Sequence, residues 1–213
     1  MPLEPALPAQ LDPGRIDALT HDASYGEVDI TGAELAGQRA GGVSVRTAAL
    51  NNVDLSGSRL EQLTLADVAL TTCSLANLHA RRADLSRVRL RTCRLTGLDL
   101  SDAQLRDVTI ADSRIDLASF GSARLTRVTF EDCLLAQSDF LDAQLDSVRF
   151  HRCDLSRGDF RGARLHRCEF RRTNLTDLQG VENLRGASME WGDILEMAAV
   201  WAATLGIGVL DQE

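Results

Sequence analysis

Residues 83–112 decide the fold; in groups of five they read ADLSR-VRLRT-CRLTG-LDLSD-AQLRD-VTIAD. The third residue of each group is a large apolar side chain, and this holds at multiples of five from Ile30 to Leu175. Only Ala40 and Ala80 break the rule among those thirty positions. A period of five fits neither an amphipathic helix nor a half-buried strand. It indicates a solenoid, in which small units stack on their neighbours.

A second inward-facing position precedes each of these residues by two. It holds mostly small or apolar side chains, whereas the other three positions carry almost all the Asp, Glu and Arg. Two inward residues separated by one outward residue indicate a short stretch of β-pleat before a corner. Residue types also repeat every twenty positions, with valine at 68, 88, 108, 128 and 148 and alanine at 83, 103, 123, 143 and 163. A repeat of four fives predicts a coil with four sides.

The groups ADLSR (83–87), GDFRG (158–162) and TNLTD (173–177) resemble the A-(D/N)-L-x-x unit of the pentapeptide-repeat family. The resemblance covers about 150 residues without an insertion. It implies an all-β fold, a right-handed quadrilateral β-helix. The family includes proteins that imitate DNA, bind DNA gyrase and protect topoisomerases from quinolones, and many members have no assigned role.

Three regions are expected along the chain. Residues 1–24 contain all four prolines and form an N-terminal lead-in, with Leu11, Ile16 and Leu19 placed to cover the first coil. Residues 25–189 form the β-helix, and Leu184, Ala187 and Met189 look like a last rung with a shifted register. Residues 190–213 form a C-terminal helix and tail that cap the other end, because bare sheet ends invite edge pairing.

The C-terminal helix is also the candidate dimer contact. Residues 190–205 have one broad apolar face. Its side chains give more apolar surface than one coil end needs, and the candidate dimer or cap residues are Trp191, Ile194, Met197 and Trp201. Related proteins dimerise through such helices, so the resemblance implies a homodimer.

No arrangement typical of catalysis is present in the sequence. Cys73, Cys93, Cys133 and Cys153 recur along the solenoid axis, which suits core packing rather than ligands converging on one metal ion. The four histidines occupy outward positions without ligand spacing. We expect no catalytic, metal-binding or cofactor-binding residues and no enzymatic activity. Neither a membrane span nor a signal peptide is apparent, and cysteine used as core filler favours the cytosol.

Charge is distributed in bands along the chain. Residues 21–180 contain 22 acidic residues against 21 arginines, and lysine is absent. An acidic band, which includes Asp99, Asp102, Asp139 and Asp142, lies between two arginine-rich belts. A DNA mimic needs continuous negative potential, because gyrase's DNA-binding surface attracts phosphates, and the belts interrupt it. No outward aromatic residues accompany the arginines, so direct nucleic-acid binding is not favoured.

Three leucines occupy outward positions within about two coils. Leu117 and Leu141 are expected near a shared corner, with Leu134 on the same side as Leu117. Single exposed leucines are ordinary, but a cluster on a polar surface can mark a docking spot. The sequence therefore predicts a non-catalytic scaffold that binds a protein partner of unknown identity through its β-helix surface. The alternative is a gyrase-binding DNA mimic.

Overall fold

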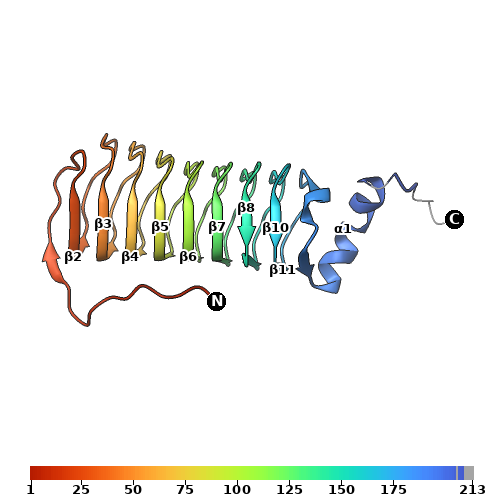
Figure 1. Ribbon diagram of the computed structural model, residues 1–213, viewed down its shortest axis with the longest axis horizontal. Helices are drawn as coiled ribbons and strands as arrows, with labels where there is room; N and C mark the ends of the chain where they lie inside the picture. Colours follow the sequence, from red (N-terminus) through yellow and green to blue (C-terminus); the bar gives the residue numbers. More distant parts are fainter. Residues whose placement is uncertain (205, 209–213) are drawn as a thin grey trace.

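The computed structural model describes residues 1–204 and 206–208 and shows a four-sided parallel β-helix capped by one helix (Figure 1). The β-helix and its C-terminal cap are confirmed. The chain begins alongside the middle of the rod, runs to one end and then winds towards the other. The strands of the first coils are β1 (Asp12–Gly14), β2 (Ser24–Thr31), β3 (Ser44–Asn51), β4 (Thr64–Thr71) and β5 (Asp84–Arg91).

The following coils contain β6 (Gln104–Ala111), β7 (Arg124–Glu131), β8 (Gln144–Asp146), β9 (Arg149–His151), β10 (Arg164–His166) and β11 (Cys168–Arg171). The chain continues through a 3-10 helix, η1 (Val181–Leu184), a strand, β12 (Ala187–Met189), and an α-helix, α1 (Trp191–Thr204).

Each strand of the rod pairs with the strand twenty residues later, so identical columns stack along the rod. Leu65 of β4, for example, pairs with Leu85 of β5, which pairs with Leu105 of β6. The two sides without named strands are joined by single bridges such as that between Asp54 and Ser74. β1 departs from this spacing and pairs with residues sixteen positions later, as Asp12 does with Val28. At the last rung the register shifts by one residue, where Cys168 pairs with Ala187. That shift confirms the sequence prediction.

The corners arise from left-handed backbone conformations. Every fifth residue from Asp22 to Asp177 has a positive φ, from 51° to 71°. A left-handed residue between short extended stretches turns the chain without a long loop. The side chains two positions before and one position after each corner point inward, as Ala80 and Ala83 do around Arg82, which explains the periodic burial.

The interior is dry and tightly filled in the later coils. Phenylalanines form two parallel stacks along the axis, one with Phe120, Phe140 and Phe160 and the other with Phe130, Phe150 and Phe170. Neighbouring rings within a stack lie 4.7–5.0 Å apart, and rings of different stacks meet edge to face. Both geometries are favourable for aromatic pairs.

The first coils are filled less completely. An apolar cavity of about 30 Å³ lies inside them, between residues that include Leu19, Val43 and Leu60. At this end leucine and valine take the place of phenylalanine. Ile16 and Leu19 cover the first coil as expected. The sequence did not reveal β1, which pairs with β2 at the same end.

Candidate functional site

The Asp or Asn at the second position of the repeat unit stabilises the corners. In Asp54, Asp99, Asp139, Asp154, Asp159 and Asn174, a side-chain oxygen accepts a hydrogen bond from the backbone N–H two residues later, at 2.7–3.1 Å. This is the usual Asx-turn geometry. Asp99 and Asp139, which were predicted to belong to a docking surface, therefore have a structural role at the start of a corner.

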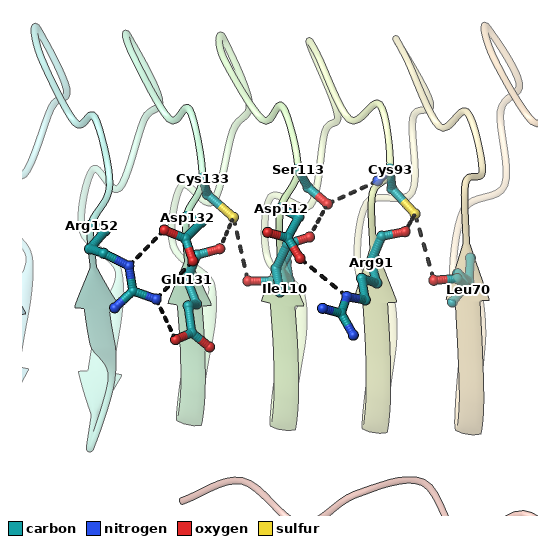
Figure 2. A network of polar contacts seen from close by, with 11 residues as sticks. Leu70, Arg91, Cys93, Ile110, Asp112, Ser113, Glu131, Asp132, Cys133 and Arg152 are labelled. Atoms are coloured by element: carbon teal, nitrogen blue, oxygen red, sulfur yellow. Dashed lines mark hydrogen bonds and ion pairs between the residues drawn. The ribbon is translucent and has the colours of Figure 1, made fainter.

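The remaining predicted acidic residues also contact neighbouring coils. Asp102 forms an ion pair with Arg81, at 3.3 Å, and a carboxylate oxygen of Asp142 lies over Gly162 of the next coil. Figure 2 shows the same arrangement at the opposite corner, two corners further along the chain, where Arg91 binds Asp112 and Arg152 binds both Glu131 and Asp132. The acidic and arginine-rich bands thus neutralise each other where they meet.

The buried Cys column carries hydrogen bonds rather than chemistry. Each thiol donates to the carbonyl oxygen 23 residues earlier, such as Cys133 to Ile110 at 3.4 Å. Thr173, in the same column, donates to the corresponding carbonyl, and Ser138 does so in another column. Figure 2 shows Ser113 of the Cys column, whose hydroxyl oxygen accepts the Cys93 N–H at 3.0 Å. The Cys73 thiol and burial raise the pKa of Cys93, and the Cys133 thiol and burial raise that of Cys153. All five thiols are buried, which keeps reagents in solvent away from them.

Residues 1–204 and 206–208 hold no group of three or more His, Cys, Asp or Glu side chains that could bind a metal ion. Within the same part of the chain, no helix has both the length and the apolar character that a membrane crossing requires.

The leucine patch, Leu117, Leu134 and Leu141, is exposed as expected. The exposed fractions are 55% for Leu117, 49% for Leu134 and 39% for Leu141. Leu117 is itself a corner residue, with φ at 60°, whereas Leu141 immediately precedes the corner at Asp142, which is one coil and one corner further along the chain. The two leucines therefore lie at opposite ends of one side of the rod, and the expectation of a shared corner is wrong.

The helix α1 divides the four predicted dimer or cap residues between two roles. Met197 is 4% exposed and packs into the core, and Trp201 is partly buried against it. Ile194 lines a hollow between α1 and the last rung. Trp191, by contrast, is 72% exposed and Leu195 is 57% exposed. Met197 thus belongs to the cap, and the outward stripe runs through Trp191, Leu195, Ala198 and Ala199.

Asp193 fixes the start of α1 on the rod. Its buried carboxylate accepts the backbone N–H of Arg172 at 2.9 Å. Burial raises the pKa of Asp193, and the Arg172 N–H opposes this effect.

Four charged corner residues form a second site, which sequence reasoning missed. This corner ladder consists of Asp67, Arg87, Asp107 and Arg127, each twenty residues after the last. Each arginine binds the preceding aspartate through two hydrogen bonds of 2.5–2.7 Å. The Arg87 guanidinium lowers the pKa of Asp67, and the Arg127 guanidinium lowers that of Asp107, against the opposing effect of burial. The alternation of Asp and Arg at a twenty-residue spacing was the available signal.

The N-terminal segment covers this ladder. Leu3 N–H donates to Asp107 at 3.1 Å, Ala6 N–H donates to Asp67 at 3.0 Å, and Glu4 pairs with Arg89 at 3.0 Å. The sequence predicted an extended lead-in but not that it folds back along the rod.

Comparison with known proteins agrees with this architecture. The model of the pentapeptide repeat region matches residues 43–120 and 116–179. No curated protein matches the sequence significantly.

Several solved structures are similar. QnrB1, a plasmid-mediated fluoroquinolone resistance protein, is 18% identical, with coverage of 91% of this chain and 97% of that one and a TM-score of 0.44. HetL from Nostoc sp. strain PCC 7120, involved in heterocyst differentiation regulation, is 18% identical, with coverage of 81% and 91% and a TM-score of 0.38. Because the family model spans more than half of the sequence, the chain belongs to the pentapeptide repeat family.

Proposed function

We propose that this protein is a non-catalytic scaffold that binds a protein partner through the leucine patch. The observation that carries the proposal is the exposure of three leucines on a surface whose charges are largely engaged with one another. Exposed ion pairs contribute little to binding or stability, whereas apolar side chains gain free energy when a partner covers them. On the sides of the β-helix, outward Leu117, Leu134 and Leu141 are therefore the groups that gain most from contact.

A capture experiment tests this function. The full-length protein is immobilised and exposed to the cytosol of its native host, and captured proteins are identified by mass spectrometry. We expect a specific protein that is retained by wild type and lost when Leu117, Leu134 and Leu141 are all replaced by Ser. The control variant, Leu195→Ser, changes an exposed leucine on α1 and should retain it. Equal capture by wild type and the triple variant would contradict the proposal.

We further propose that two copies associate through the outward stripe of α1. The stripe is apolar and exposed, and α1 is held firmly to the rod by Met197 and the Asp193 contact with Arg172. A two-fold pairing of such helices covers Trp191 and Leu195 of both copies. The dimer would present two leucine patches on rods joined at their C-terminal ends. We place the protein in the cytosol, since all five cysteines are free thiols.

The second candidate is a DNA mimic that binds gyrase, which the family resemblance implies. The negative charges on the rod support this second function only where the carboxylates are not engaged in hydrogen bonds or ion pairs within the rod. Because Asp99 and Asp139 hold corners and Asp102 pairs with Arg81, we rank this function below the scaffold.

A further inference from the structure

The aspartates of the corner ladder are less exposed than the aspartate of the equivalent pair at the next corner. Asp132 and Arg152 form the same kind of pair at the next corner, with hydrogen bonds of 2.7 and 2.8 Å, yet the Asp132 side chain is 43% exposed. The Asp107 side chain is 4% exposed and that of Asp67 is 15% exposed. The N–H groups of Leu3 and Ala6 contact these two carboxylates, so the N-terminal segment lies over the ladder and contributes to its cover together with the arginines.

The spacing of the two partners matches. Asp67 and Asp107 lie two coils apart, which is about 9.6 Å at the usual distance between strands. Leu3 and Ala6 lie three residues apart, which is about 9.3 Å in an extended polyproline conformation. Pro2, Pro5 and Pro8 recur with the same period of three. Prolines hold the segment extended and leave the N–H groups of Leu3 and Ala6 directed at one side.

A third contact adds selectivity for charge. Glu4, between the two N–H donors, binds Arg89 of β5 at 3.0 Å. Pro2, Pro5 and Leu7 are partly buried and add apolar contact. The rod thus recognises a segment of the form P-x-E-P-x through two carboxylate acceptors and one guanidinium.

The segment is held mainly by this site rather than by its connection to the rod. A hollow lies between residues that include Leu7 and Gln10 on one side and Glu27 and Thr47 on the other. The chain therefore bridges the first coils and docks again 61 and 104 residues away in sequence. Such a segment behaves as a peptide ligand tethered at a high effective concentration.

We infer that the corner ladder is a peptide-binding site for extended, proline-spaced acidic segments of other proteins, occupied in this structure by residues 2–7 of the chain itself. A segment of the form P-x-E-P-x reproduces all three polar contacts and displaces the tethered one. This site is independent of the leucine patch, because Asp107 and Leu117 are alternate corners, and therefore opposite corners, of one four-sided coil. Its test does not depend on the scaffold proposal.

The test uses the full-length variant with Leu3→Pro and Ala6→Pro. Both substitutions remove an N–H donor and keep the segment extended, and neither residue belongs to the core. The probe is a fluorescein-labelled peptide with the sequence of residues 2–10, PLEPALPAQ, titrated in a fluorescence anisotropy assay. We expect saturable binding to this variant, and about tenfold weaker binding to wild type, whose own segment competes.

Matched control variants distinguish specific recognition of the peptide at the corner ladder from non-specific adhesion to the rod. Adding Asp67→Ala and Asp107→Ala to the variant should weaken peptide binding about tenfold, because both charge-assisted hydrogen bonds are lost. Adding Asp132→Ala instead should leave it unchanged. A peptide with Gln in place of Glu4 should bind more weakly. The proposal is overturned if binding to the double proline variant does not saturate by about 1 mM, which is too weak to be specific, or if the Asp67 and Asp107 substitutions leave it unchanged. Equal binding to wild type would overturn the claim that the segment occupies the site.

Discussion

At the scale of single residues, the fold depends on the conformation of the corner residue. A non-glycine residue in the left-handed region has its Cβ close to the following carbonyl oxygen, at a cost of roughly 1–2 kcal/mol. The rod accepts this at many corners, including bulky ones such as Leu117 and Arg157. Backbone hydrogen bonds to the next coil, such as that from Leu117 N–H to the Ala136 carbonyl at 3.0 Å, hold each corner in place.

Substitution of two glycines compares the cost of a left-handed backbone conformation alone with the cost of a steric clash added to it. Gly57 has φ at 64° and open space where a Cβ would lie, whereas a Cβ on Gly180 would lie 2.4 Å from the Arg161 nitrogen. We expect Gly57→Ala to lower the free energy of unfolding by about 1 kcal/mol and Gly180→Ala by more, about 3 kcal/mol. Chemical denaturation followed by circular dichroism measures both. Equal losses would mean that the backbone at Arg161 yields to the new methyl group.

The corner ladder should make stability depend on pH in the acid range. The pKa of Asp107 is lower in the folded protein than in the unfolded chain, chiefly because of Arg127. Its stabilising effect is therefore complete above the unfolded value, about 3.9, and is lost as the pH falls through the lower, folded pKa.

We expect Asp107→Asn to lower the melting temperature most at pH 7 and to approach wild type as the pH falls below 4. The matched variant Asp132→Asn removes an exposed pair and should have a smaller effect at pH 7. If the two variants have the same melting temperature at every pH, burial of the ladder does not increase its contribution to stability.

At the scale of elements, the rod balances volume within each coil. Phe120, Phe140 and Phe160 face small partners at Ala118, Ser138 and Gly158, whereas Leu100 is accompanied by Leu98. A larger side chain at one of the two inward positions of a unit requires a smaller one at the other, because protein interiors are packed as densely as organic crystals.

This balance predicts coupling between Leu98 and Leu100. Leu100→Phe alone should overpack the coil and cost about 1–3 kcal/mol, and Leu98→Ala alone should leave a cavity and cost about 2–5 kcal/mol. The double variant extends the phenylalanine stack by one coil and should lose at least about 1 kcal/mol less than the sum. Additive losses in chemical denaturation would argue that the two positions do not share space.

Two substitutions in α1 should have different effects, because Leu195 lies on the outward stripe and Met197 packs into the core. Replacing Leu195 by Lys places a charge on the outward stripe, so analytical ultracentrifugation should show a monomer while circular dichroism and the melting temperature remain near wild type. Replacing the buried Met197 by Ala removes core packing and should lower stability by about 2–5 kcal/mol. A wild-type protein that is itself monomeric at micromolar concentration would rule out the dimer.

At the scale of the whole molecule, the pairing of charges sets the surface potential. Arginines of one coil bind aspartates of the coil before or after it, so the net charge of the rod is nearly balanced at short range. Most of the formal net charge of −8 lies in the terminal regions. These pairs reduce the negative charge that the rod offers to a DNA-binding surface.

A supercoiling assay with purified gyrase, with and without quinolone, distinguishes the scaffold from the DNA mimic. We expect no inhibition and no protection at low micromolar protein, because paired carboxylates give little of the counterion-release free energy that drives DNA-like binding. Protection that disappears when Asp102, Asp112 and Asp142 are all replaced by Asn would reverse the ranking of the two functions. An effect that persists in that variant would point to contacts other than the acidic band.

The sequence by itself determined the phase of the repeat, the two inward columns, the four-sided coil and the helical cap. These features follow from the pattern of apolar and polar residues, which each five-residue unit repeats and which indicates the side chains that are buried. The corner residue was also readable in hindsight, since Gly, Asn and Asp recur there.

Only the tertiary structure decided which surface groups are free. The Asp–Arg pairs of the corner ladder join different coils, so each depends on rotamers across the rod rather than on sequence neighbours. The N-terminal segment docks up to 104 residues away, and no local pattern specifies such a contact. The outward stripe of α1 likewise depends on how Met197 and Asp193 orient the helix against the last coil, because an amphipathic sequence does not say which apolar residues a partner element will cover.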